Sequence, residues 1–220
     1  MATEIPYSVR RSNRARRVRV TVDPHDGVEV VLPARAPARE AAAAVAQLRG
    51  WIERRLAEAE AVRSHVAARG DTVPYLGSDL RLVAETGRTR VHRRGDALLV
   101  PADPATGAAA LERWYRRAAR AEIAPRLDAA AARLGRSYTR LTIRAQRTRW
   151  GSCSSTGVMS FNWRLLLAPE AVLDYVVWHE ACHLVAMDHS PRFWALVAEH
   201  CPDYQAPRRW LRRNGATLVL

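Results

Sequence analysis

One stretch, residues 176–185, constrains the fold of this chain more than any other. It reads Val-Val-Trp-His-Glu-Ala-Cys-His-Leu-Val, so an H-E-x-x-H motif lies inside a run that is otherwise almost wholly apolar. Pro169 and Glu170 precede it, as residues at the start of a helix commonly do. A helix that is apolar on nearly all sides is buried. Two histidines and a glutamate on such a helix are costly unless each has a partner.

The spacing of these polar residues is that of a metal site. In a helix of about 3.6 residues per turn, His179 and His183 lie on one face, as two ligands of one ion must. Glu180 lies beside them, where it can reach a water molecule on that ion. The pattern predicts a zinc metallohydrolase with two histidine ligands and Glu180 as general base. The alternative is a buried histidine pair that is hydrogen-bonded only to backbone.

A third ligand is expected from the residues that follow the motif. His189 precedes Ser190 and Pro191, which have the residue types of an N-cap and a first helical position. His189 therefore lies in a turn between two helices, where the chain can fold back to the metal. Glu199, on the second of these helices, is the rival ligand. We favour His189, because only this residue has a turn placed to present it.

The histidine spacing also matches that of the metzincin proteases, but two other features of that class are missing. Ala186 stands where metzincins carry glycine, and no methionine follows Met187 to form a Met-turn. A classical metzincin is therefore not expected.

Composition narrows the class of protein further. The 220 residues carry a formal net charge of +13, and all 35 basic residues are arginine. Such a charge attracts polyanions, but arginine without lysine, together with abundant alanine, is typical of a GC-rich coding bias. Nucleic-acid binding is therefore only weakly indicated.

The chain shows no sign of a membrane or secreted protein. No stretch approaches about 18 uninterrupted apolar residues, so no membrane partner is expected. The polar, arginine-rich N-terminus lacks the apolar segment of a secretory signal, which favours a cytoplasmic location. The three cysteines form no C-x-x-C pair, and their odd number argues against a disulfide framework.

Hydrophobic periodicity predicts an α+β chain in two regions. Residues 1–104 form a β-rich N-terminal region with one long helix, and residues 105–220 a catalytic region. The expected elements are a hairpin over 5–33 with its turn at 23–27, a helix over 38–68, strands at 73–76, 80–84, 89–92 and 97–100, a linker over 101–107, a helix over 107–134, strands at 139–146 and 157–163, the metal helix, and helices over 191–200 and 206–213.

Three further stretches accompany the metal motif: Arg-Trp-Gly-Ser-Cys-Ser at 149–154, Phe-Asn-Trp-Arg-Leu at 161–165 and His-Ser-Pro-Arg-Phe-Trp at 189–194. With them the chain resembles the YgjP-like metallopeptidase domain family, which is related to SprT-like zinc proteins and M48-type metallopeptidases. The resemblance implies a zincin-like α+β catalytic half. It also implies zinc held by His179, His183 and His189, with Glu180 as base. Family members are called peptidases from the motif, yet one branch is described as hydrolysing UTP to UMP and pyrophosphate.

Residues near the metal are candidates for substrate binding. Negative charge develops on oxygen whether a peptide carbonyl or a phosphorus atom is attacked, and it needs a positive or donor group nearby. Arg149 and Asn162 are the candidates for that role, and Trp150 for a wall of the cleft. A surface ion pair for Arg149 and core packing for Trp150 are the alternatives. The strand over 158–162 is expected to offer a free edge to an extended peptide.

Three functions remain open. The leading one is a metallopeptidase that cleaves peptide or protein substrates with a zinc-bound water activated by Glu180. The first alternative is a nucleoside triphosphate (UTP-type) pyrophosphohydrolase at the same site, which the arginines at 140, 144, 147 and 149 would suit. The second is a DNA-associated zinc module. Glu180 argues against it, because a structural zinc site needs no base and usually has four protein ligands.

Overall fold

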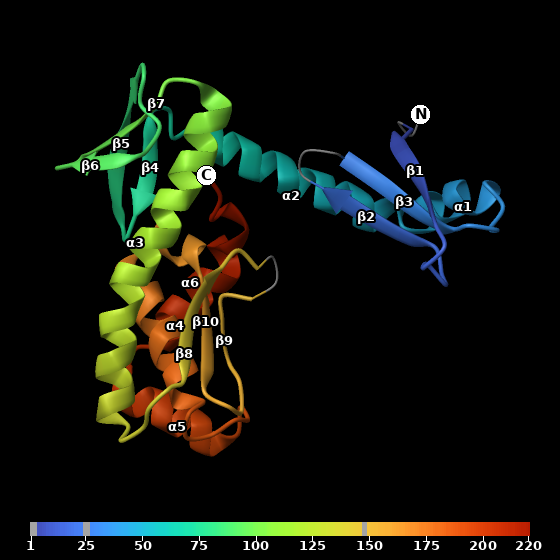
Figure 1. The fold of residues 1–220 in the computed structure, drawn as a ribbon. Coiled ribbons are helices and arrows are strands. Elements are labelled where there is room, and N and C mark those ends of the chain that lie inside the picture. Colours follow the sequence, from blue (N-terminus) through green and yellow to red (C-terminus); the bar gives the residue numbers. More distant parts are fainter. Residues whose placement is uncertain (1–3, 24–26, 147–148) are drawn as a thin grey trace. The chain divides into compact units, whose positions relative to one another are not determined.

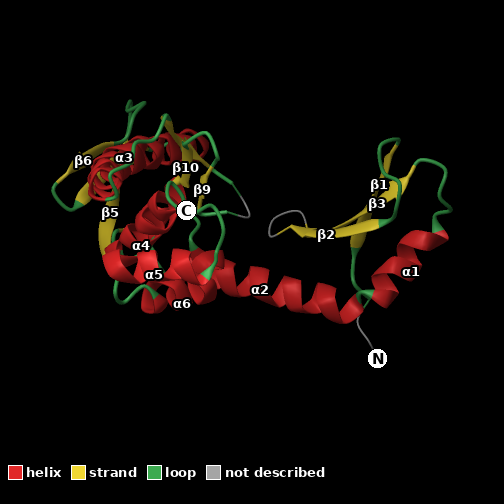
Figure 2. Cartoon of the chain, turned by 90° about the horizontal axis from the view of Figure 1, so that it is seen from below, coloured by secondary structure: helices red, strands yellow, loops and turns green. Residues whose placement is uncertain are grey.

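The computed structural model describes residues 4–23, 27–146 and 149–220. Helices and three small sheets are distributed along the whole chain, which confirms the predicted α+β class (Figure 1, Figure 2). Residues 24–26 of the expected turn, and Arg147 of the arginine group, lie outside the described residues.

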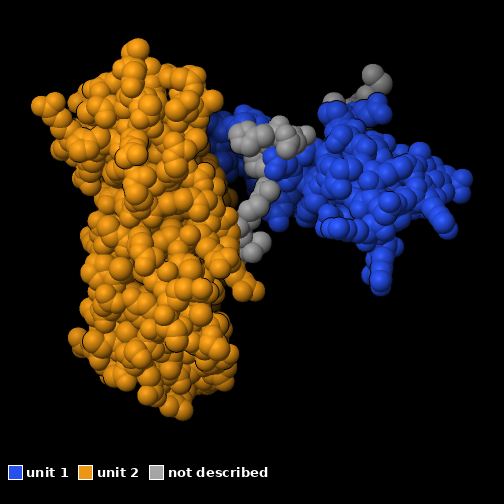
Figure 3. Space-filling view, in the orientation of Figure 1, with its two compact units in different colours: residues 1–68 blue, residues 69–220 orange. Residues whose placement is uncertain are grey.

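By its internal contacts the chain divides into two compact units, residues 1–68 and residues 69–220 (Figure 3). The sequence analysis placed the boundary between residues 104 and 105, within the predicted linker over 101–107. Packing places residues 69–104 with the second unit instead: Leu80 and Leu98 belong to the same apolar cluster as Ile123 and Leu173. This segment therefore supports the catalytic region directly.

The first unit is a three-stranded sheet with two helices against it. The strands are β1 (Tyr7–Ser12), β2 (Arg19–Asp23) and β3 (Gly27–Pro33), in the order β1-β3-β2. β3 pairs antiparallel with β2, as the predicted hairpin requires, and parallel with β1. The buried core comprises Ile5, Val28, Val30, Leu32, Ala41, Val45 and Ile52.

The single helix predicted over residues 38–68 is wrong, because the structure has two. α1 (Arg39–Gln47) ends at Leu48, whose φ of −97° and ψ of 9° interrupt the helix, and α2 (Arg49–Ala67) begins at the next residue. The break allows Val45 of α1 and Ile52 of α2 to enter the same core. Gly50, a weak helix former two residues after Leu48, was the only indication of this break in the sequence.

The second unit begins with a four-stranded sheet of order β4-β5-β7-β6. Its strands are β4 (Thr72–Tyr75), β5 (Ser78–Glu85), β6 (His92–Arg94) and β7 (Ala97–Pro101). β5 and β7 are parallel, and the outer pairs are antiparallel. All four strands were expected, although β6 lies slightly later than predicted.

Helix α3 (Pro104–Arg133) joins this sheet to the catalytic region. The predicted linker over 101–107 already contains its start: the Asp103 side chain accepts a hydrogen bond from the Thr106 amide at 2.8 Å, and proline occupies the first helical position. α3 packs on β7 and on α4 (Glu170–Cys182), and it runs the length of the unit in Figure 1. Among the described residues, no helix combines the length and the apolar character needed to cross a membrane.

A third sheet lies beside α4. It consists of β8 (Arg140–Arg144), β9 (Gly151–Cys153) and β10 (Val158–Asn162), in the order β8-β10-β9. β10 pairs parallel with β8 and antiparallel with β9. The prediction of a free edge on the strand over 158–162 is therefore wrong, because both edges of β10 are paired. The edge strand nearest α4 is β9.

The remaining elements surround α4. A short 3-10 helix, η1 (Trp163–Leu167), precedes it, α5 (Pro191–His200) and α6 (Gln205–Asn214) follow, and η2 (Gly215–Thr217) closes the chain. The tip of the β4–β5 hairpin contacts the segment that leads into α4. There the Leu76 amide donates to the Leu166 carbonyl at 2.8 Å, and Gly77, with φ of 88°, packs against Pro169. The second sheet thus helps to fix the start of the helix that carries the motif.

Candidate metal centre and active site

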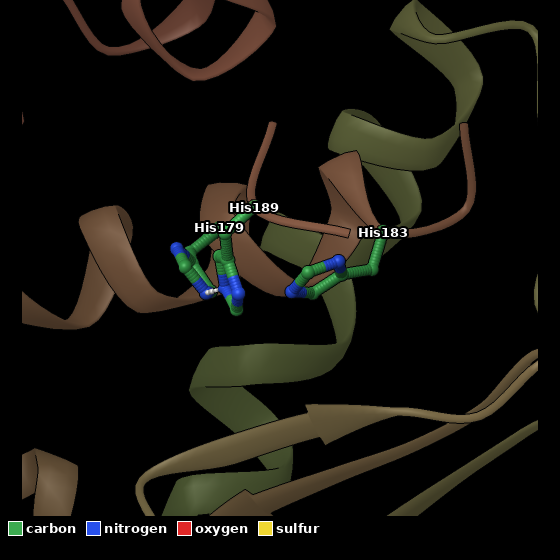
Figure 4. Close-up of side chains that lie close together, drawn as sticks. All are labelled: His179, His183 and His189. Carbon is green, nitrogen blue, oxygen red and sulfur yellow. Dashed lines mark hydrogen bonds between the residues drawn. The ribbon is translucent and has the colours of Figure 1, made fainter. Parts of the chain in front are cut away.

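Three histidines meet at the end of α4. His179 lies in its last turn, His183 caps its C-terminus, and His189 lies in the loop before α5. Their ligand nitrogens all lie within 4.8 Å of one another. Figure 4 shows the rings turned toward one another, with 3.0 Å between Nε2 of His179 and Nε2 of His189. The residues that the sequence singled out as metal ligands are therefore brought together.

Neighbouring groups fix the orientation of these rings. Nδ1 of His183 lies 3.0 Å from the Ala186 carbonyl, so this nitrogen carries the proton and Nε2 keeps its lone pair. Phe193 of α5 is fully buried and packs against all three rings, with centroid distances of 4.9, 4.4 and 4.9 Å. The sequence-based reasoning missed Phe193, although it follows His189 by only four residues.

The donor set fits a zinc ion. In a tetrahedral site with Zn–N distances of about 2.0–2.1 Å, two ligand nitrogens are about 3.3 Å apart, close to the separation of His179 and His189. Burial holds the pKa of His179 at about 3, with further contributions from the other two imidazoles and from Arg208. Burial also lowers the pKa of His183. Both rings are therefore neutral, which is the form that binds metal.

Glu180 is buried beside this cluster. Burial raises the pKa of its carboxyl group from 4.5 to about 7. The positive charge of Arg149 and a hydrogen bond from the Cys153 backbone amide act in the opposite direction and lower this pKa. A carboxylate in such a position is a strong candidate for a general base.

Gly151 of β9 makes room for the Glu180 side chain. A Cβ atom at this position would lie 2.5 Å from Cγ, 2.6 Å from Oε1 and 2.8 Å from Cδ of Glu180. Only glycine therefore allows β9 to approach the carboxylate this closely. The Gly-Ser-Cys segment was part of the family resemblance, but its role as the support of Glu180 depends on a contact between distant parts of the chain.

In protein freed of metal, Glu180 is expected to make stability depend on pH. Because its pKa is higher in the folded state, the folded protein retains a proton that the unfolded chain releases. Stability relative to Glu180→Gln should therefore fall as the pH rises from 4.5 to about 7, by about 3 kcal/mol in total, and level off above that range. Urea unfolding of both chelated proteins from acid to neutral pH would measure the difference. A difference that stays constant with pH would contradict the burial of this carboxylate.

The three histidines and Glu180 line a cavity of about 270 Å³. Arg149, one of the substrate-binding candidates from the sequence, lies in its wall. Four further residues of the wall were not anticipated as site residues: Gly151, Ser152, Cys153 and Met187. Met187 is half exposed and forms an apolar part of the rim.

Asn162 is not at this cavity, contrary to the expectation from sequence. It is buried, and its side-chain amide donates to the carbonyls of Gln146 at 2.7 Å and Arg149 at 3.3 Å. Its side-chain oxygen accepts from the Arg164 amide at 3.1 Å. With its polar atoms engaged by backbone, Asn162 holds the Gln146 and Arg149 carbonyls in place.

Trp150 lines a second, neighbouring cavity of about 590 Å³. The other residues of its wall are Tyr175, Gln205, Arg208, Arg209, Leu211 and Arg212. The Trp150 indole also packs against Gly215, where a Cβ atom would lie 3.0 Å from the ring. Trp150 therefore packs against Gly215 and also lines this second cavity.

Glu199, the rival third ligand, is exposed on α5 and lies outside the histidine cluster.

His189→Ala is expected to lower the affinity for zinc by more than about 10–100-fold. That range is the usual loss when a residue that only supports a metal ligand is changed, and His189 would itself be a ligand. Glu199→Gln should leave the affinity unchanged. Competition for zinc with a chromophoric chelator measures both. The assignment fails if Glu199→Gln shows the larger loss.

Most of this chain matches one family of known proteins. Residues 16–214 match the family described as YgjP-like, metallopeptidase domain. No curated protein matches the chain. Among solved structures, the crystal structure of the metallopeptidase zymogen of Pyrococcus abyssi abylysin is 23% identical. That match covers 44% of this chain and 99% of the other, with a TM-score of 0.38.

Proposed function

The chain belongs to the YgjP-like metallopeptidase family, and from that premise we propose that it is a zinc-dependent peptidase that hydrolyses peptide bonds in polypeptide chains. The observation that supports this most is the meeting of three histidine nitrogens and one buried carboxylate at a single cavity. Three protein ligands leave a coordination position free for water, as in catalytic rather than structural zinc sites.

Each residue has a separate task. His179, His183 and His189 would hold the ion through their ring nitrogens. When bound, zinc would lower the pKa of a water molecule to about 7 and polarise the substrate carbonyl. Glu180 takes the proton of the attacking water and delivers it to the leaving amine, with its carboxylate held by the Cys153 amide. Arg149 supplies positive charge for the developing oxyanion.

No described strand pairs with the outer edge of β9, and this free edge offers a place for the substrate backbone. The Asn162 amide donates to the Trp150 carbonyl at 2.8 Å, and the Ser154 amide to the Val158 carbonyl at 3.0 Å. Because hydrogen-bonded and non-bonded pairs alternate in an antiparallel ladder, the polar groups of Gly151 and Cys153 face away from β10. Glu180 accepts a hydrogen bond from the Cys153 amide. The amide and carbonyl of Gly151 and the carbonyl of Cys153 therefore remain to form hydrogen bonds with the backbone of an extended peptide.

A nucleoside triphosphate hydrolase is the second candidate, and one observation favours it. The cavity beside the metal site is lined by Arg208, Arg209 and Arg212 and by the indole of Trp150. Guanidinium groups bind phosphate, and an aromatic ring can stack on a base. The peptidase remains first because a free strand edge next to the catalytic groups recognises a polypeptide backbone.

Removal and return of the metal would test the proposal. A chelator is expected to abolish cleavage of a fluorescently labelled unfolded protein, and stoichiometric zinc should restore it. His183→Ala should stay inactive after zinc is returned. Cleavage that survives chelation, or that proceeds at the wild-type rate in His183→Ala, would show that another site or a contaminant is responsible.

A further inference from the structure

The cavity next to the metal site has a strongly basic wall. Arg208, Arg209 and Arg212 come from one side of α6, with the first and last of them one helical turn apart. All three are exposed, and they line a space of about 590 Å³ together with the rings of Trp150 and Tyr175. The wall contains no carboxylate among the described residues.

These arginines differ from several others in the chain because, among the described residues, they have no acidic partner. Arg126 on α3, for example, contacts the carboxylates of Glu122, Glu170 and Asp174. Within the described part of the chain, no ion pair is formed by Arg208, Arg209 or Arg212. Arg208 lies over the Trp194 ring at 4.4 Å, and Arg209 donates to the Gln205 side chain at 3.4 Å. The three positive charges therefore remain free to bind an anion.

This basic cavity of about 590 Å³ adjoins the catalytic cavity, the space of about 270 Å³ at the three histidines and Glu180. Arg149 and Gly151 line the catalytic cavity, and Trp150, which lies between them in sequence, lines the basic one. The Tyr175 ring is 5.8 Å from the ring of His179, one turn farther along α4. Trp150 also directly precedes β9, so a peptide extended along the free edge of β9 would reach the basic cavity within a few residues.

We propose that this cavity is a substrate subsite for a carboxylate side chain, so that the enzyme prefers acidic polypeptides with Asp or Glu a few residues from the cleaved bond. This rests on the proposed peptidase function. A guanidinium group binds a carboxylate through two parallel hydrogen bonds. The backbone of the same substrate would pair with β9, and the rings of Trp150 and Tyr175 would flank the bound side chain.

The test compares matched peptides in metal-loaded wild type and two variants. The peptides share one scissile core and carry either Glu or Gln at the flanking positions. Arg212→Gln removes a charge from the cavity. Arg213→Gln removes the same charge from the neighbouring position on α6, outside the cavity wall. Arg208 is left intact because it packs on Trp194, which lies against the metal ligands.

We expect wild type to cleave the Glu peptide with a kcat/KM about tenfold above that of the Gln peptide at low salt, as for a charge-assisted hydrogen bond. The preference should shrink at high salt. Arg212→Gln should lose most of the preference through slower cleavage of the Glu peptide, and Arg213→Gln should keep it. Equal cleavage of both peptides by wild type, or an unchanged preference in Arg212→Gln, would overturn the subsite.

A binding measurement separates this proposal from the peptidase function itself. If neither peptide is cleaved, the proposed function fails, but the subsite can still be measured by polarisation of labelled peptides on Glu180→Gln protein. Tighter binding of the Glu peptide that is lost in Arg212→Gln and kept in Arg213→Gln supports a carboxylate site. UTP that binds more tightly than the Glu peptide, with the same dependence on Arg212, would assign the cavity to a nucleotide and overturn the proposal.

Discussion

Glu180→Gln is expected to lower kcat for peptide hydrolysis by about 10²–10⁴-fold, the usual contribution of a general base. Glutamine keeps the shape of the side chain but cannot accept the proton of the attacking water. The three histidines are unchanged, so zinc content should stay at the wild-type level. Steady-state cleavage of a quenched fluorescent peptide, together with metal analysis of the same samples, measures both quantities.

Glu199→Gln is the matched control for this change. It also replaces one carboxylate by an amide, but on the exposed face of α5 and outside the catalytic cavity. We expect it to cleave the peptide at the wild-type rate. If Glu180→Gln with full zinc retains wild-type kcat, the carboxylate is not the base, and the mechanism proposed for this site is wrong.

Gly151→Ala is expected to cost about 10²-fold in kcat, the penalty for misplacing a catalytic group by about 1 Å. The added methyl group would lie 2.5 Å from Cγ of Glu180. β9 is held by its pairing with β10, so the Glu180 side chain must move and lose its hydrogen bond to the Cys153 amide. Overpacking should also lower the free energy of unfolding by about 1–3 kcal/mol. Zinc content should not change.

A double variant distinguishes this account from general damage to the fold. If Gly151→Ala acts through the position of Glu180, it should have little further effect on kcat in a Glu180→Gln background. Gly50→Ala serves as the control, since a Cβ atom there makes only an ordinary contact of 3.7 Å. Independent, multiplicative losses in the double variant would show that Gly151 does not act by supporting Glu180.

The meeting of the three histidines could be predicted from sequence because their geometry is mostly local. His179 and His183 are placed by helical periodicity, and His189 by a helix start that Ser190 and Pro191 mark. These signals depend only on a few neighbouring residues, so they can be read without knowledge of the rest of the fold. Most strands and helices of the second unit were visible for the same reason, through their alternating or helical apolar patterns, but the short strand β9 was not predicted.

Features that depend on contacts between distant segments were missed or misplaced. The sequence predicted a free edge on β10, but sheet order depends on which strands pair, and β9 is the edge beside the metal helix. Asn162 was expected at the cavity, yet it is satisfied by backbone groups of a neighbouring segment. The basic helix over 206–213 was visible in the sequence, but its place beside Trp150, like the role of Gly151, depends on approaches between distant parts of the chain.

The most direct test of the central claim is to identify the product. Zinc-loaded wild type and Glu180→Gln would each be incubated with an unfolded protein and, separately, with a panel of nucleoside triphosphates. New peptide termini would be read by mass spectrometry, and pyrophosphate would be measured enzymatically. We predict new peptide termini that require Glu180, without pyrophosphate release. Pyrophosphate release that requires Glu180, with the unfolded protein left intact, would contradict the peptidase account and make this a nucleotide hydrolase.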